Sequence, residues 1–450
     1  IKDKLIKYYF EKLYENPALH DKVEFEILFS CYDLSLKNRL QELKKSNFSN
    51  SEIQKIKKIL LDFTNDIIQT FPEIMTESKE SMNILNIKSK ITKKHDKNDH
   101  KSCVNSIKNL LEDCKNYGTL PFSRMARIAF ISTIILKSLE NKEKISSKVI
   151  DGIMNSIETP LTKIYEDLKL LSNNKISDKE FLNIYGHLRP GTYDITAKRY
   201  DQNREFYEDI KYLKIRTSKN IIIPKNKINS ILKKEGLIFE NIDFIDFVRK
   251  SLELREFLKF EFTKNLSDAL EIIADLGNIF KLSREDMSNI NIKTILKIQN
   301  HSYNEANKIL RKEILKNQNN KSINDRINLP PILFSKKDFT VITHYFSKPN
   351  FITQKKILAD SIKLDNLHHV NELLNKIILI ENADPGYDWI FSKNPSGLIT
   401  KYGGVASHMS IRCAELKLPA AIGCGDILYE QLSKATKIML DCKNQQIIVL

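Results

Sequence analysis

The segment from Gly403 to Ser410 carries His408 behind two adjacent glycines, and it is the part of the chain best suited to chemistry. Glycines let the backbone approach a phosphate closely. Apolar residues follow at helical spacing, so we expect a helix that begins at the histidine. A helix N-terminus offers free N–H groups and the positive end of a dipole, which together bind anions. Because imidazole supplies a nucleophilic nitrogen, a histidine placed there could accept a phosphoryl group.

A simpler interpretation of His408 is structural, because a histidine at a helix start often caps or packs, and a Gly-Gly pair is a common loop signal. The spacing of residues around His408 helps to decide between the structural and the chemical interpretation. Two variable residues separate the glycines from Ser407 and His408, and a helical stretch follows. It ends in a Leu-x-x-Pro-Ala turn and a Gly-x-Gly, which are Leu416, Pro419, Ala420, Gly423 and Gly425.

This pattern resembles the phosphohistidine signature of the phosphoenolpyruvate (PEP)-utilising enzymes, such as PEP synthase, pyruvate phosphate dikinase and rifampin phosphotransferase. The resemblance implies that His408 is transiently phosphorylated. It also implies that four neighbours support the phosphate, namely Gly403, Gly404, Ser407 and Ser410. Several relatives carry threonine two residues before the histidine, where this chain has Ala406. A hydroxyl contact would therefore have to come from one of the two serines.

The 450 residues predict two or three domains, and 41% hydrophobic residues suffice for real cores. No run approaches eighteen apolar residues, so we expect no membrane span. The chain begins at Ile1 without a methionine, and we interpret it as a piece of a longer protein. Six cysteines are scattered without a Cys-x-x-Cys pair, which favours a cytoplasmic location with neither disulfides nor a metal site.

The net charge of +15 comes from 72 Lys and Arg against 57 Asp and Glu. The lysines are interleaved with acidic and apolar residues throughout, so we do not expect a nucleic-acid partner. Residues 351–450 hold eleven basic and ten acidic residues, which places the excess upstream. A basic surface there would equally suit anionic nucleotides or phosphorylated intermediates.

The fold class that we expect is α+β and multidomain, with a large all-α domain over residues 1–325. Glycine is sparse there, and apolar residues recur at helical spacing, as in Arg127–Leu139 and residues 252–276. Ser177 and Ser283 carry capping-box patterns that predict helix starts. The lysine-rich opening of the stretch from Ile87 to Asp113 favours a solvated loop.

The spacing of apolar residues stops being helical near Pro330 and Pro331, because proline cannot continue a helix. We place a linker over residues 326–345 and a small α/β domain over residues 346–450. From Phe339 onward, short β-type runs alternate with helix-like segments. They are Phe339–Thr343, Ile377–Ile380, Gly397–Thr400, Ala420–Ile422, Ile438–Leu440 and Ile447–Leu450. The resemblance implies a swivelling β/β/α phosphohistidine domain.

A second polar cluster lies between Phe181 and Asp194, where Tyr, His, Arg, Pro and Asp surround two glycines. It is open to two interpretations. One is a helix C-cap followed by a Pro-Gly turn. The other rests on its resemblance to a stretch in the helical substrate domain of the rifampin phosphotransferase type, which implies that His187, Arg189 and Asp194 face the acceptor.

Two further segments have both a structural and a functional interpretation. Arg124 and Arg127 are three residues apart on a predicted helix and could bind phosphate from one face, or they could simply face solvent. The segment Ala383–Phe391 contains the only Trp of the chain. A Pro-Gly turn under a packed Trp explains it structurally, and a role at the phosphate site is the alternative.

The resemblance also concerns the energy source. No glycine-rich loop of the ATP-grasp type precedes residue 330, so the chain itself is expected to hold no cofactor. ATP and Mg are expected on an ATP-grasp domain in the parent chain or on a partner protein. The implied activity is a dikinase-type phosphotransferase with a small-molecule acceptor. A phosphocarrier or regulatory docking module without its own acceptor chemistry remains the alternative.

Overall fold

The computed structural model describes the chain except for residues 21, 93–94, 143, 155, 204–222, 325–331, 340–347, 365–371 and 405–406. The contacts between its residues divide it into two compact units. The first unit holds Ile1–Lys88, Asp113–Pro160 and Thr217–Phe262, and the second holds Ser89–Glu112, Leu161–Arg216 and Thr263–Leu450.

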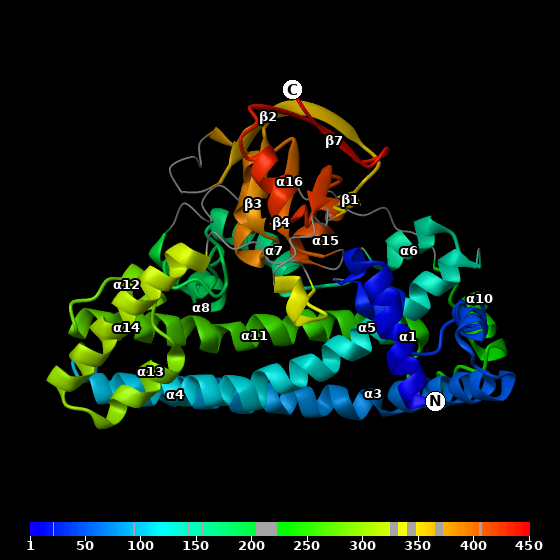
Figure 1. The fold of residues 1–450 in the computed structure, drawn as a ribbon, viewed down its shortest axis with the longest axis horizontal. Coiled ribbons are helices and arrows are strands. Elements are labelled where there is room, and N and C mark those ends of the chain that lie inside the picture. The colour runs from blue at the N-terminus through cyan, green and yellow to red at the C-terminus, as the bar shows by residue number, and fades with distance from the viewer. Residues whose placement is uncertain are drawn as a thin grey trace. The chain divides into compact units, whose positions relative to one another are not determined.

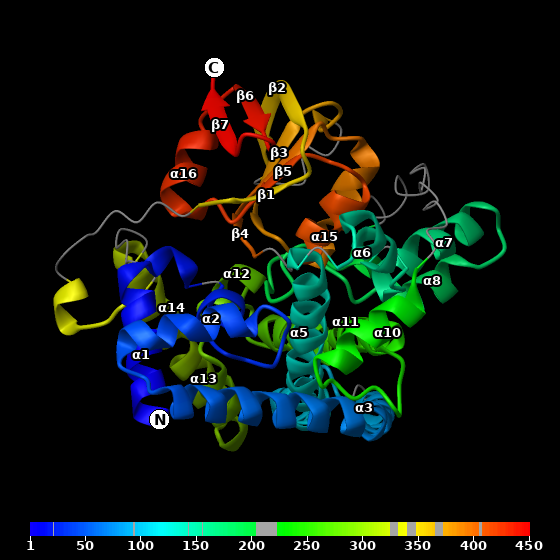
Figure 2. The ribbon, with the colours of Figure 1, turned by 90° about the vertical axis from the view of Figure 1, so that its right-hand side faces the viewer.

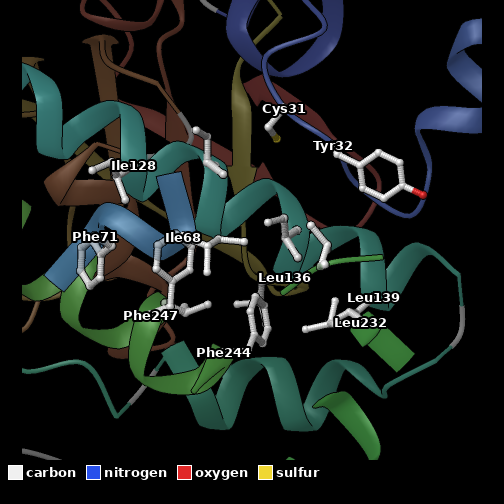
Figure 3. Packing of buried hydrophobic residues seen from close by; sticks show 14 of the residues in the cluster. Cys31, Tyr32, Ile68, Phe71, Ile128, Leu136, Leu139, Leu232, Phe244 and Phe247 are labelled. Atoms are coloured by element: carbon white, nitrogen blue, oxygen red, sulfur yellow. The ribbon is translucent and has the colours of Figure 1, made fainter. Parts of the chain in front are cut away.

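The first unit is helical. Its helices are α1 (Lys2–Glu15), α2 (Leu36–Glu42), most of α3 (Asn50–Thr92), α5 (Leu120–Asn141), α6 (Ser147–Met154), α10 (Lys225–Lys234) and the first half of α11 (Phe244–Ile279). Its core is lined by side chains from several of these helices. Figure 3 shows Phe71 of α3 near Phe247 of α11, and these rings meet edge to face with their centroids 5.1 Å apart.

The second unit combines helices with a sheet. Its helices are α4 (His100–Asp113), α7 (Pro160–Ser172), α8 (Asp178–Tyr185), the rest of α11, α12 (Arg284–Ser288), α13 (Ile292–Lys297), α14 (Tyr303–Asn324), α15 (His408–Glu415) and α16 (Gly425–Leu432). The strands are β1 (Asn350–Ile352), β2 (Lys356–Lys363), β3 (Ile377–Asn382), β4 (Gly397–Tyr402), β5 (Ala420–Ile422), β6 (Lys437–Asp441) and β7 (Gln446–Val449). The 3-10 helix η10 (Pro385–Lys393) connects β3 to β4.

The seven strands form one sheet in the order β1-β5-β4-β3-β2-β6-β7. Strands β2, β3, β4 and β5 run parallel to their neighbours in this series, while β1, β6 and β7 pair in antiparallel fashion. Figures 1 and 2 show α16 beside this sheet. Ile377, Ile378, Leu379 and Ile380 of β3 are all fully buried. Consecutive buried residues are expected of a central parallel strand that is covered on both faces.

The structure confirms the expected α+β class, with a large helical region and a small C-terminal sheet domain. The helix starts are also confirmed, because Ser177 and Ser283 both close capping boxes. Strands form at the five expected runs from Ile377 onward. Strands β1 and β2 were not predicted, since their half-exposed residues lack a continuous apolar run.

The solvated loop expected from the lysine-rich opening of the stretch Ile87–Asp113 is confirmed at residues 95–99, which lie between two helices and are mostly exposed, but it does not extend over the rest of the stretch. Helix α3 continues to Thr92 and α4 begins at His100, so most of the described stretch is helical. Val104, Ile107 and Leu110 are fully buried in the core of the second unit. The lysines that suggested a loop occupy only its first part.

The expected linker over residues 326–345 lies mostly outside the described residues, as does the expected strand Phe339–Thr343. The boundary between residues 1–325 and 346–450 therefore stays a prediction. Within the described part, α14 runs to Asn324, and a short 3-10 helix spans Lys336–Phe339.

One helical stretch among the described residues, His100–Glu140, is long and apolar enough to cross a membrane, and 39% of the tested window is buried. It supplies buried core residues such as Ile107, Ile128 and Ile131. A core helix passes this test of length and composition, so the stretch is weak evidence for a membrane span.

Replacing Leu379 by Ala should destabilise the chain by about 2–5 kcal/mol, because the fully buried side chain would leave a cavity in the sheet core. Leu358→Ala in β2 is the matched control, since Leu358 is 48% exposed. Urea unfolding followed by circular dichroism checks both. Equal losses in the two variants would show that the sheet core is not packed as described.

Candidate functional site

The candidate site lies at the carboxyl ends of β3 and β4, which are parallel neighbours paired from Ile377–Gly397 to Asn382–Tyr402. After β3 the chain enters η10, and after β4 it enters the loop that leads to α15. Because parallel strands end at the same edge of a sheet, these two connections meet there. Helix α15 packs against η10, β1 and β5.

Helix α15 begins at His408, as the sequence predicted. Ser407 is the N-cap, and its hydroxyl accepts a hydrogen bond from the Ser410 N–H at 3.4 Å. The Ser410 hydroxyl donates to the Gly404 carbonyl at 3.0 Å. Both hydroxyls thus hold the loop and the helix start together. Their predicted support of a phosphate is a separate role that stays a prediction.

The two glycines of this loop differ in what they do. Gly403 has φ +136°, and a Cβ there would lie 2.6 Å from the Cβ of Ala383. A side chain is therefore excluded by both conformation and space. Around Gly404, no described atom lies within 4 Å of the position that a Cβ would take. Gly403 is required for packing, while Gly404 leaves room beside the helix start.

His408 is paired with a carboxylate. Its Nε2 lies 2.6 Å from Oδ1 of Asp388 in η10. The side chains are only 8% and 1% exposed, respectively. A histidine that bonds a carboxylate through one ring nitrogen has its tautomer and its ring orientation fixed by that bond.

The other oxygen of Asp388 contacts two further groups. Oδ2 accepts a hydrogen bond from the Tyr165 hydroxyl at 3.0 Å and forms an ion pair with Arg412 Nε at 3.3 Å. The Arg412 guanidinium lies over the Tyr165 ring at 4.5 Å, and its Nη1 bonds Glu415. Tyr165 belongs to α7, so this buried cluster joins the sheet domain to a helix of the same unit.

The charges in this cluster follow from their surroundings. Burial alone would raise the pKa of Asp388, but the charges of His408 and Arg412 hold it below its usual value. Burial raises the pKa of Tyr165 well above its usual value. Asp388 is therefore an ionised acceptor, and Tyr165 is a protonated donor. Burial would lower the pKa of Arg412, yet Tyr165, Asp388 and Glu415 raise it, so the guanidinium stays charged.

Comparison with protein families adds a match over the same region. Residues 374–445 match the family model described as PEP-utilising enzyme, mobile domain. The match lies within the sheet domain, from just before β3 to just before β7. No curated protein matches the chain. The match covers the two connections that meet at His408, and it supports phosphotransferase chemistry that proceeds through a phosphorylated histidine.

The structure gives Arg189 a structural role. Its side chain is 1% exposed and pairs with Glu271 at 2.8 Å. The guanidinium also donates to the carbonyls of Asp194, Ala197 and Ser267. These bonds tie the segment after α8 to α11, and both Nη atoms of the guanidinium are already engaged.

The other two residues of the predicted acceptor side differ in exposure. His187 is buried, and its carbonyl accepts a hydrogen bond from Ser267 at 2.7 Å. Asp194 is exposed, and its Oδ1 accepts from the N–H and the hydroxyl of Thr196. Burial first and then nearby acids, Asp194 among them, raise the pKa of Tyr387 to about 12. The charge of Asp194 therefore acts on Tyr387, in the turn that carries Asp388.

Arg124 and Arg127 lie in α5 of the first unit, on its exposed side. Arg124 pairs with Glu77 at 2.7 Å, and Arg127 pairs with Glu24 at 3.4 Å. Among the described interactions, none links either arginine to His408, so their predicted contact with phosphate stays a prediction. Among the described residues, no group of three or more His, Cys, Asp or Glu side chains is arranged to hold a metal ion.

Sequence reasoning did not single out Asp388, Tyr165 or Arg412. Two signals could have found the first and last of these. Asp388 follows β3 as His408 follows β4, and Arg412 lies one helical turn after the histidine. Tyr165 is more than two hundred residues from Asp388, and no local signal marks it.

The lowered pKa of Asp388 predicts a pH effect on stability. A carboxyl with a folded pKa below its unfolded value, about 3.9, contributes stability above that value and loses it as pH falls through the folded pKa. Asp388→Asn should therefore flatten the acid side of the stability curve. Urea unfolding between about pH 2 and pH 5 checks this. Asp360→Asn, an exposed site on β2, is the control, and an unchanged slope in Asp388→Asn would contradict the assignment.

Proposed function

We propose that this chain is part of a phosphotransferase in which His408 receives a phosphoryl group and passes it to an acceptor. The observation that carries the proposal is the position of His408. It is the first residue of α15, at the carboxyl edge of a parallel sheet in a PEP-utilising enzyme mobile domain. The N–H groups of that helix start favour anions, and Gly404 leaves space beside them.

In the proposed reaction, a ring nitrogen of His408 forms a bond to phosphorus while the bond from phosphorus to the donor oxygen breaks. The leaving oxygen keeps the electron pair. Loop N–H groups and the helix start offset the charge on the phosphoryl oxygens. We propose the β-phosphate of ATP as the source, held with Mg on an ATP-grasp domain of the parent chain or a partner.

The acceptor would be held by the helical part of the second unit. Asp194 is the predicted residue that best fits a base for the acceptor hydroxyl, since it is exposed and its charge acts on Tyr387 in η10. His187 lies in the same segment but is buried. Arg189 supports the segment from within, which is a positioning role.

The alternative is a phosphocarrier or regulatory docking module. The engagement of Arg189 favours it, because the cation that an acceptor phosphate would need is already paired with Glu271. In this case phosphorylated His408 would signal to a partner without transfer to a small molecule. Acceptor-dependent loss of the label from His408 separates the two functions.

His408→Ala should reduce labelling from ATP to background when the ATP-grasp partner or domain is supplied. The label of the unchanged chain should be acid-labile and stable in base, as expected for phosphohistidine. Peptide mass spectrometry checks both points. His20→Ala, an exposed histidine of the first unit, is the control and should label normally. Full labelling of His408→Ala would remove the basis of the proposal.

Asp194→Asn should slow transfer from phosphorylated His408 to the acceptor by about a hundredfold or more, the usual contribution of a general base. Labelling of His408 itself should be unchanged. A chase of the labelled chain with candidate acceptors, among them pyruvate and hydroxyl compounds, measures the loss of label. Asp151→Asn, an exposed acid in α6, serves as the control. A normal chase with every acceptor would exclude Asp194 as the base.

A further inference from the structure

The contact between Asp388 and His408 determines the protonation of the histidine. An ionised carboxylate 2.6 Å from Nε2 requires that this nitrogen carry a hydrogen. A protonated Nε2 has no lone pair with which to attack phosphorus. A phosphoryl group on Nε2 would also take the place of Oδ1 and would set two anions against each other. The contact and a phosphate on Nε2 are thus mutually exclusive.

Asp388 is held in place by the helical part of the second unit. The Tyr165 hydroxyl of α7 donates to its second oxygen, and the ring supports the Arg412 guanidinium that pairs with the same oxygen. Tyr165 is 4% exposed, so this hydrogen bond is shielded from water. Hydrogen bonds to a charged group are the stronger ones, and shielding strengthens them further.

A second contact lies two residues before Asp388. A Cβ on Gly386 would lie 1.7 Å from the carbonyl oxygen of Arg189, so only glycine permits this approach. The Tyr200 hydroxyl donates to the Gly386 carbonyl at 3.4 Å. The segment around Arg189 therefore contacts the turn at Gly386, although the sequence marks the two as separate motifs.

We propose that α7 and the segment around Arg189 and Tyr200 form a docking site for the unphosphorylated mobile domain, in which Asp388 holds His408 non-nucleophilic at Nε2. Phosphorylation of Nε2 then requires the Tyr165 and Gly386 contacts to open. By linkage, phosphorylation weakens docking by the same factor as docking weakens phosphorylation. This proposal rests on His408 being the phosphorylated residue.

Phosphoramidate provides a test that needs no ATP-grasp domain. Nε2 bonds to phosphorus, the P–N bond of phosphoramidate breaks, ammonia leaves, and the ring gives its proton to water. The full chain is treated in four forms: unchanged, Gly386→Ala, Tyr165→Phe and Tyr185→Phe. Tyr185→Phe is the matched control, because its hydroxyl donates to Asp167 at 2.7 Å, a different carboxylate from Asp388.

We expect Gly386→Ala and Tyr165→Phe to label at Nε2 at least about tenfold faster than the unchanged chain. Tyr165→Phe loses a hydrogen bond to a charged group, which corresponds to a factor of this order, and Gly386→Ala forces a Cβ against the Arg189 carbonyl and so opens the second contact. Tyr185→Phe should label at the unchanged rate. Proton–nitrogen correlation spectra identify the labelled nitrogen. Hydrogen exchange in peptides from α7 and η10 should rise on phosphorylation of the unchanged chain and should already be raised in Gly386→Ala.

Equal labelling rates in all four proteins, zero included, would overturn the docking proposal, and so would a label on Nδ1 of the unchanged chain. Circular dichroism checks that each variant is folded. Because Gly386→Ala and Tyr165→Phe disrupt different contacts, the proposal can still be tested if one of them misfolds. The docking proposal and the proposed function can fail independently of each other. Phosphoramidate labelling can follow the expected order when ATP-dependent labelling fails, and ATP-dependent labelling can succeed when the order is not found.

Discussion

The site depends on one buried interaction, the contact of the Asp388 carboxylate with His408, Arg412 and Tyr165. An ionised carboxylate with 1% exposure is stable only where cations and hydrogen-bond donors surround it. The two parallel strands bring η10 and α15 to one edge, which supplies the first two partners. The third partner comes from a distant helix, so the charge state of the site is linked to how the sheet domain meets α7.

The loop glycines and serines place His408 for this interaction. Gly403 packs against Ala383, and Ser407 and Ser410 close the helix start, which fixes the first residue of α15 opposite η10. His408 is thereby oriented by the loop on one side and by Asp388 on the other. A nucleophile that is held in this way has a defined direction of attack once the carboxylate withdraws.

The polar segment from Phe181 to Asp194 has a structural role that the sequence did not predict. Arg189 was expected to face the acceptor, and its side chain lies inside a network with Glu271 and Ser267. Its backbone carbonyl, not its side chain, faces the mobile domain at Gly386. The density of polar groups in this segment therefore reflects a rigid support for a docking contact, next to an exposed acid at Asp194.

The sequence by itself determined the helix start at His408, the strands from Ile377 onward and the helix caps at Ser177 and Ser283. These features are local, because they depend on spacing and capping within a few residues. Only the tertiary structure decided that Asp388 pairs with His408 and that Tyr165 and Gly386 make the domain contact. These partners are far apart along the chain, and no local pattern encodes a contact that depends on sheet order and packing. Residues 95–99 form the expected loop, whereas the helix from His100 onward depends on the burial of Val104, Ile107 and Leu110 in a core that residues of α11 and α14 also line.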